Sequence, residues 1–80
     1  MARYYFHVRD RDKLIEDTEG QELPDAAAVR GEALASAREL LAEAILLGEP
    51  MEHRIFDIVD EGGRKVATIP FSEALDRSGR

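Results

Sequence analysis

The side chains best suited to metal or acid–base chemistry are the two histidines, His7 and His53. Imidazole nitrogens and carboxylate oxygens are common zinc ligands, so these histidines could form a metal site with Asp10, Asp12 or Asp57. The histidines stand far apart in the sequence, and no spacing typical of a metal site surrounds either of them. We therefore expect histidines that face solvent or form hydrogen bonds. Small-ligand or metal-dependent activity at His7 and His53 is kept as an alternative.

Hydroxyl side chains give no better starting point for catalysis. A hydrolytic centre needs a nucleophile, a base and an orienting group within reach of one another. No catalytic motif surrounds Ser36, Ser72, Thr18 or Thr68. The sequence therefore favours a non-enzymatic protein and predicts no catalytic residue, no cofactor and no metal ligand.

One predicted strand, Arg3 to Arg9, carries aromatic and cationic side chains on the same face. Sheet proteins that bind RNA stack bases on faces of this kind. The chain nevertheless holds 17 acidic residues against 11 lysines and arginines, a net charge of −6. Because phosphate binding depends on clustered cations, nucleic acid is disfavoured as a partner.

The same strand face is the first candidate interaction surface. In the predicted strand from His53 to Asp60, Ile55 and Val59 alternate with Phe56 and Ile58. If the two strands are neighbours, Ile55 and Val59 share the outer face with Tyr5. Exposed apolar patches often mark association. The predicted contact residues on this face are Tyr5, His7, Ile55 and Val59.

A long helix, Asp25 to Leu47, must organise these strands. Asp25 is a good N-cap, Gly48 suits the left-handed residue that ends a helix, and Pro50 prevents the helix from resuming. Apolar residues recur along it at steps of three and four and should form one core-facing stripe. The stripe consists of Ala26, Val29, Ala33, Ala37, Leu40, Leu41, Ala44 and Leu47.

A second apolar edge beside this stripe includes Leu34 and Ile45. These side chains either flank the core or take part in a dimer interface, because small domains bury little surface on their own. Leu34 and Ile45 therefore complete the candidate interaction surface.

Most of the remaining residues are predicted to form short strands and turns. Alternating or β-branched residues predict strands at Arg3–Arg9, His53–Asp60 and Arg64–Pro70. Lys13–Ile15 can form a brief further strand, and Asp60–Gly63 predicts a hairpin turn. Ser72–Asp76 is expected to form a last helical turn, and residues 77–80 a frayed tail.

These elements predict an α+β fold. The helix stripe and one sheet face must bury each other, giving two layers with one long helix packed on a three- to four-stranded mixed or antiparallel sheet. The expected order is β-(β)-α-β-β. If the first strand and the strand after the helix are neighbours, we expect them to be parallel and joined by a right-handed crossover.

Length and composition indicate the number of domains and the cellular compartment that we expect. Eighty residues predict one domain, residues 1–80, and the absence of cysteine fits a reducing compartment. There is no signal-peptide core and no apolar run of about 20 residues that could span a membrane. We expect a soluble cytoplasmic protein with no membrane association.

Four segments give the chain a resemblance to a known family: Tyr4–Arg9 (YYFHVR), Asp17–Asp25 (DTEGQELPD), Val59–Arg64 (VDEGGR) and Ile69–Leu75 (IPFSEAL). The chain resembles a family of small uncharacterised proteins, a domain of unknown function, from rhizobia and related alphaproteobacteria. The resemblance implies a bacterial single-domain protein and supplies no catalytic residues. A weaker resemblance connects the chain to HicB-type antitoxins, in which a Leu-Pro-Asp-like segment also leads into an Ala- and Leu-rich helix.

The sequence therefore favours a small protein-interaction or regulatory module that forms a homodimer or binds another protein. The alternative implied by the weaker resemblance is an antitoxin-like partner of a basic toxin or an RNA-binding protein.

Overall fold

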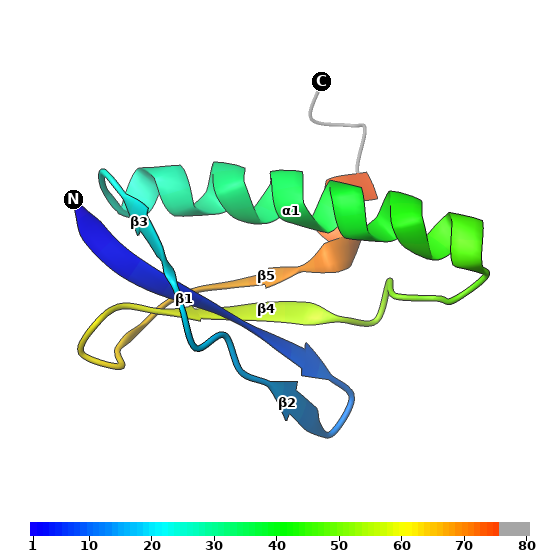
Figure 1. Ribbon diagram of the computed structural model, residues 1–80, viewed down its shortest axis with the longest axis horizontal. Coiled ribbons are helices and arrows are strands. Elements are labelled where there is room, and N and C mark those ends of the chain that lie inside the picture. Colours follow the sequence, from blue (N-terminus) through cyan, green and yellow to red (C-terminus); the bar gives the residue numbers. More distant parts are fainter. Residues whose placement is uncertain (76–80) are drawn as a thin grey trace.

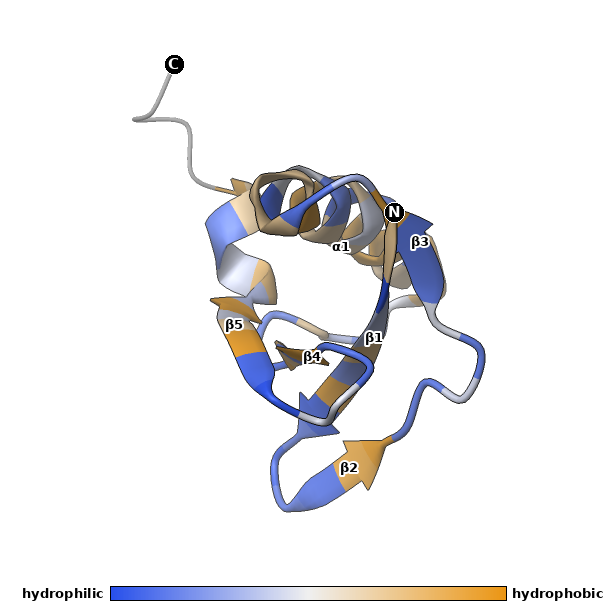
Figure 2. Cartoon of the chain, turned by 90° about the vertical axis from the view of Figure 1, so that its left-hand side faces the viewer, coloured by the Kyte–Doolittle hydropathy of each residue, from blue (hydrophilic) through white to orange (hydrophobic). Residues whose placement is uncertain are grey.

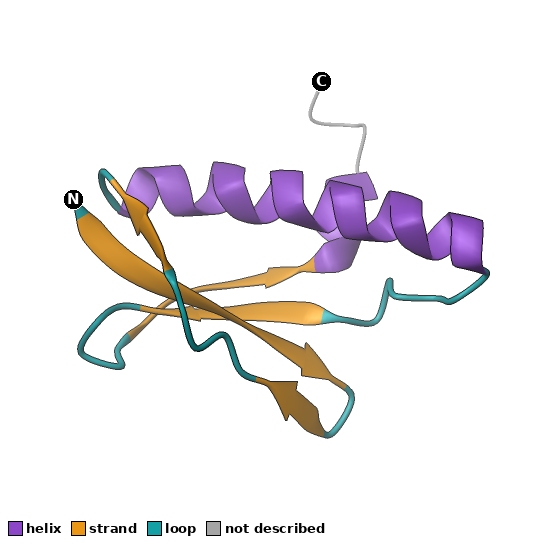
Figure 3. Cartoon of the chain, viewed as in Figure 1, coloured by secondary structure: helices purple, strands orange, loops and turns teal. Residues whose placement is uncertain are grey.

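One long helix crosses one face of a five-stranded antiparallel sheet, which confirms the predicted α+β fold (Figure 1; Figure 3). The computed structural model describes residues 1–75, so Asp76 and the tail predicted at 77–80 lie outside the described residues. In chain order the elements are β1 (Ala2–Asp10), β2 (Lys13–Ile15), β3 (Gln21–Leu23), α1 (Ala26–Leu47), β4 (Ile55–Val59), β5 (Lys65–Pro70) and η1 (Phe71–Leu75), a 3-10 helix.

Both ends of α1 are set by the predicted capping residues. The Asp25 carboxylate accepts a hydrogen bond of 3.1 Å from a first-turn N–H, and Gly48 is left-handed with φ 71°. At the C-terminal end, the Gly48 N–H donates to the Ile45 carbonyl and the Glu49 N–H to the Ala44 carbonyl, at 3.2 and 2.9 Å. These are the two hydrogen bonds of a Schellman motif.

The strand β1 pairs with neighbours along both edges. The sheet order is β2-β1-β4-β5, and β3 pairs with the first part of β1 while β2 pairs with its last part. On the opposite edge, β4 pairs with β1 from Tyr5 to Arg9. The short strands β2 and β3 therefore share one edge of β1.

β1 and β4 are neighbours but run antiparallel, so the expected parallel pairing and crossover are wrong. That expectation allowed only one brief strand between residues 11 and 24. In the structure both β2 and β3 run antiparallel to β1 and carry the chain back to the end where β1 begins. The helix α1 then runs in the same general direction as β1, and β4 returns (Figure 1). Lys13–Ile15 is confirmed as a strand, whereas the strand at Gln21–Leu23 was not predicted.

The core lies between α1 and the inner face of the sheet. Tyr4 is buried, and Phe6 packs against the core, as the alternation along β1 predicts. The Phe56 ring lies 4.7 Å from the Phe71 ring and 5.9 Å from the Phe6 ring, measured between centroids. Figure 2 shows the helix over the sheet, with β2 farthest from it. The buried helix residues, mostly small, are Val29, Ala33, Ala37, Leu41 and Ala44.

The C-terminal part of α1 extends beyond the strands (Figure 1). A helix of 22 residues spans about 33 Å, whereas five residues, the length of β4, span about 17 Å. The strand β4 therefore runs beside only about half of the helix. Leu47, predicted to face the core, is 64% exposed, and Ala26 at the other end is exposed as well. The predicted stripe is correct in its middle and wrong at both ends.

Candidate functional site

The outer face of the sheet gathers four of the six predicted contact residues. Cross-strand pairing places Tyr5 opposite Val59, His7 opposite Asp57, and Arg9 opposite Ile55. The Tyr5 and His7 rings are stacked, with centroids 6.5 Å apart and planes at 19°. Tyr5, His7, Ile55 and Val59 are all partly buried. We call these four residues the outer sheet face.

A buried carboxylate stands at the centre of this face. The Asp57 side chain is only 7% exposed, and it pairs with the Arg9 guanidinium and with Lys65 Nζ, the latter at 3.3 Å. The Thr68 hydroxyl donates to the same carboxylate at 3.4 Å. Burial alone would raise the pKa of Asp57, but the hydrogen bonds and positive charges of Arg9 and Lys65 hold this pKa below its ordinary value. Asp57 is therefore a paired anion at neutral pH and is poorly suited to act as a base.

The histidine of the outer sheet face is tied to a turn. Asp17 N–H donates to His7 Nδ1 at 3.0 Å, and the Asp17 carboxylate accepts from the N–H groups of Phe6, Glu19 and Gly20 at 3.0 to 3.2 Å. Burial would raise the pKa of Asp17, but these three donors lower it overall. On this edge of β1, β3 pairs with Ala2–Tyr4 and β2 with Val8–Asp10, so neither strand reaches Phe6. The Asp17 carboxylate therefore accepts the hydrogen bond from the Phe6 N–H that a strand carbonyl would otherwise accept.

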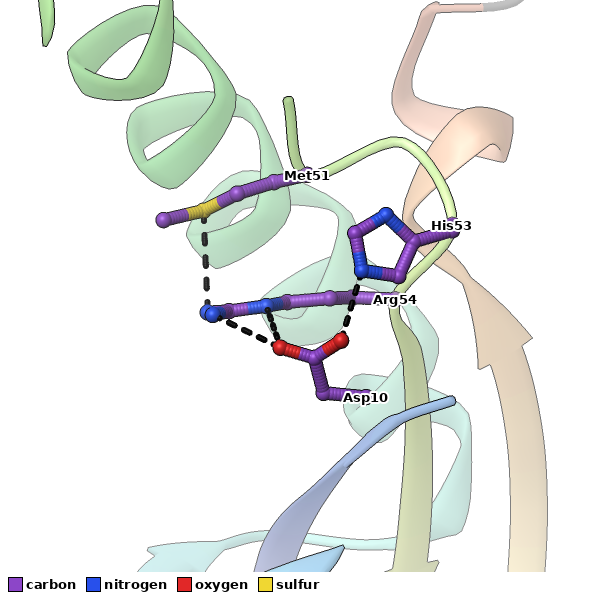
Figure 4. Close-up of polar contacts among 4 residues, drawn as sticks. All are labelled: Asp10, Met51, His53 and Arg54. Atoms are coloured by element: carbon purple, nitrogen blue, oxygen red, sulfur yellow. Dashed lines mark hydrogen bonds and ion pairs between the residues drawn. The ribbon is translucent and has the colours of Figure 1, made fainter. Parts of the chain in front are cut away.

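The second histidine belongs to a separate cluster (Figure 4). His53 Nε2 lies 2.6 Å from Asp10 Oδ1, and Arg54 contacts the other carboxylate oxygen through Nε at 3.1 Å. Arg54 also donates to Met51 Sδ at 3.7 Å. The hydrogen bond with His53 lowers the pKa of Asp10 most, and the Arg54 charge adds to this, against partial burial that would raise the pKa. The cluster ties the end of β1 to the segment before β4, which starts at Ile55 rather than at the predicted His53.

His7 and His53 therefore have different partners. His7 bonds to Asp17, and His53 bonds to Asp10. Among residues 1–75, no group of three or more histidine or acidic side chains is placed to hold a metal ion. Both histidines are hydrogen-bonded within the fold.

A pocket of about 280 Å³ lies at the overhanging end of α1, between the helix, the following loop and η1. Its apolar lining consists of Leu41, Ala44, Ile45, Pro50, Met51 and Leu75, and the exposed residues Glu49 and Glu52 also line it. Leu34 and Ile45, which were predicted to share one surface, lie in different environments. Leu34 packs against the core, whereas Ile45 lines this pocket.

Exposed apolar side chains are concentrated at the same end of α1, and two of them, Ile45 and Leu75, also line the pocket. Ile45, Leu46 and Leu47 are 76%, 86% and 64% exposed in the last turn of α1, and Leu75 of η1 is 49% exposed. We call these four residues the apolar helix end. The sequence-based prediction missed Leu46 and Leu75 as contact residues and assigned Leu47 to the core-facing stripe. A signal was present, because three consecutive apolar residues on a helix point in directions about 100° apart and cannot all face one sheet.

Comparison with known proteins gives a family but no described relative. Within the described residues, no helix is long and apolar enough to cross a membrane. Searches of curated proteins and of solved structures find no significant match. A family described as a domain of unknown function, DUF6894, matches residues 3–72, from β1 into η1. The resemblance to uncharacterised proteins is thus confirmed at that level, and the chain belongs to the DUF6894 family.

Proposed function

We propose that the protein is a small non-enzymatic interaction module that binds another protein through the apolar helix end. One observation carries the proposal: four of the eight exposed large apolar side chains within residues 1–75 lie at this end of the molecule, where Ile45 and Leu75 line an apolar pocket and Leu46 and Leu47 belong to the same last turn of α1. Exposure of apolar groups to water is unfavourable. Exposed apolar clusters that are surrounded by polar residues are typical of contact surfaces.

The rest of the fold supports this use of the helix end. The Schellman motif at Gly48 holds the last turn, and the Asp10, His53 and Arg54 cluster holds the loop that forms one pocket wall. Met51 belongs to both, because it lines the pocket and accepts a hydrogen bond from Arg54. A preorganised surface loses little conformational entropy when a partner binds.

Self-association is the second candidate, and the outer sheet face favours it. The helix covers only the opposite face of the sheet (Figure 1), and Tyr5 and Val59 are cross-strand partners on the face away from the helix. The ion pairs of Arg3 with Glu22 and of Asp57 with its two cations balance much of the charge there. Two copies could therefore meet at this face without strong like-charge repulsion. Tyr5→Glu should then weaken a dimer measured by sedimentation, and an unchanged dimer would exclude this face.

The family resemblance supports a bacterial cytoplasm as the setting of the module. An antitoxin-like role, with a basic toxin as partner, is the narrower form of the same proposal and rests on the HicB-type resemblance alone.

Affinity purification with matched baits tests the interaction module. The helix-end bait carries Ile45→Ser and Leu46→Ser, and the control bait carries Leu14→Ser and Ile15→Ser, an exposed apolar pair on β2. We expect wild type and the control bait to retain the same partner and the helix-end bait to lose it. Equal retention by all three baits would show that the helix end is not the contact surface.

A further inference from the structure

The size of the helix-end pocket indicates what kind of group it takes. Its volume is about 280 Å³, and it is lined by apolar groups such as Leu41, Ala44 and Met51. Small-molecule sites typically measure about 300–1,000 Å³ and hold several convergent polar groups. This pocket is at the lower limit of that range, and it fits one or two apolar side chains of a protein segment.

The charge around the pocket is negative. Glu49 and Glu52 line it. Within residues 1–75 neither carboxylate forms an ion pair. The last turn of α1 has no basic residue, so the negative end of the helix dipole adds to the same field. Arg54, which lies near the pocket, is paired with Asp10.

This charge distinguishes between the possible occupants. A symmetric dimer through this end would bring the Glu49 and Glu52 carboxylates of both copies into one interface. Like charges brought together at an interface weaken binding, and the whole chain already carries −6. A partner with lysines or arginines around an apolar anchor has the complementary charge.

We propose that the apolar helix end binds a cationic amphipathic segment of another protein, with an apolar anchor in the pocket and basic side chains against Glu49 and Glu52. Helices of this type commonly dock into apolar grooves through residues at i, i+3, i+4 and i+7. The inference rests on the proposed function and adds the chemistry of the partner.

Designed peptides of about fifteen residues, a length at which isolated helices are marginally stable, are suitable probes. All carry leucine at the same i, i+3, i+4 and i+7 positions, and the remaining positions are lysine, glutamine or glutamate. Binding to the full chain is measured by fluorescence anisotropy at physiological salt, and the site is mapped by amide chemical shifts in NMR spectra. We expect the lysine peptide to bind at least about tenfold more tightly than the glutamine peptide, with the glutamate peptide weakest.

Matched variants separate a local effect from general attraction to an acidic protein. The pair Glu49→Gln and Glu52→Gln should weaken binding of the lysine peptide by about fivefold or more, because both carboxylates line the pocket. The control pair Glu32→Gln and Glu39→Gln changes the net charge equally elsewhere on α1 and should change binding less than about twofold.

The outcomes separate this inference from the proposed function. If lysine and glutamine peptides bind equally at Ile45 and Met51, the partner is not selected by charge and only the inference fails. Equal losses in both Gln pairs would have the same meaning. If shifts map away from the helix end, or no peptide binds, both proposals fail. If dilution of the protein alone moves the same signals, a second copy occupies the site and the inference is wrong.

Discussion

Asp57 shows how a buried charge is accommodated in a sheet that a helix covers on one side only. Its carboxylate is withdrawn from water on the outer sheet face, and such burial is costly unless the charge is paired. Arg9 from β1 and Lys65 from β5 supply the pairing from both sides of β4. Three strands are thus joined by one side chain in addition to their backbone hydrogen bonds.

The lowered pKa of Asp57 predicts acid-sensitive stability. A carboxylate whose folded-state pKa lies below its unfolded value, about 3.9, stabilises the fold fully above that value. This contribution is lost as the pH falls from about 4 through the folded-state pKa. Urea unfolding at a series of pH values should show a smaller acid-induced loss in Asp57→Asn than in wild type, with Glu39→Gln as the control. Equal losses in Asp57→Asn and wild type would exclude Asp57 as a source of the effect.

At Gly20 the backbone conformation and the neighbouring side chains both require glycine. Its φ is +73°, and an added Cβ would lie 2.9 Å from both Arg3 Cγ and Tyr5 Cε2. Gly20→Ala should therefore lower the free energy of unfolding by about 1–3 kcal/mol, since strained backbone and a close contact both oppose it. Gly31 is the matched control, because a Cβ added there, inside the helix, would meet nothing within 4 Å. Gly31→Ala should raise stability by about 0.5–1 kcal/mol. Similar effects of both substitutions in urea unfolding would contradict this account.

At the scale of elements, the mismatch between a long helix and short strands creates the apolar helix end. The sheet and η1 bury the middle of α1, and the last turn projects beyond them (Figure 1). On that turn Ile45, Leu46 and Leu47 are exposed, whereas Ala44 is buried. Leu41, one turn before Ile45, is 4% exposed and belongs to the core.

The free energy of unfolding of variants tests this division of α1 into a buried middle and an exposed end. Ile45→Ala and Leu46→Ala should change the free energy of unfolding by less than about 0.5 kcal/mol each, as exposed substitutions usually do. Leu41→Ala should cost about 2–5 kcal/mol, because it leaves a cavity between helix and sheet. A large loss for Ile45→Ala or Leu46→Ala would mean that these side chains hold the fold together.

Local signals predicted most elements, and long-range geometry explains the errors. The caps at Asp25 and Gly48 and the alternation along β1 depend on neighbouring residues, so one sequence reveals them. The strand β3 has only three residues and gains its strand conformation from pairing with β1, which no local pattern shows. The expected parallel orientation of β4 assumed a direct crossover from β1 through α1, whereas β2 and β3 first return the chain along β1.

The candidate site was predictable only in part, for the same reason. Tyr5, His7, Ile55 and Val59 could be placed on one face by counting alternate residues. The pocket depends on how far α1 projects past the strands and on where η1 packs, which are tertiary properties. Leu34 and Ile45 looked alike on the helix, and only packing separates them.

The whole molecule presents two different surfaces. On the outer sheet face, cations and carboxylates are paired within the chain. At the apolar helix end, exposed leucines and isoleucine adjoin carboxylates that have no cation partner within residues 1–75. Such an asymmetry favours a different partner for each surface, and it places the strongest candidate for recognition of another protein at the end of α1.

Site-specific photo-crosslinking in the protein's own cells tests this central claim most directly. A photoreactive amino acid replaces Leu46 in one variant of the full chain and Leu14, an exposed leucine of β2, in a control. We predict a covalent adduct with another protein from position 46 and none from position 14. An adduct from position 14 alone, equal adducts from both positions, or none from either would contradict the claim that the apolar helix end is the contact surface.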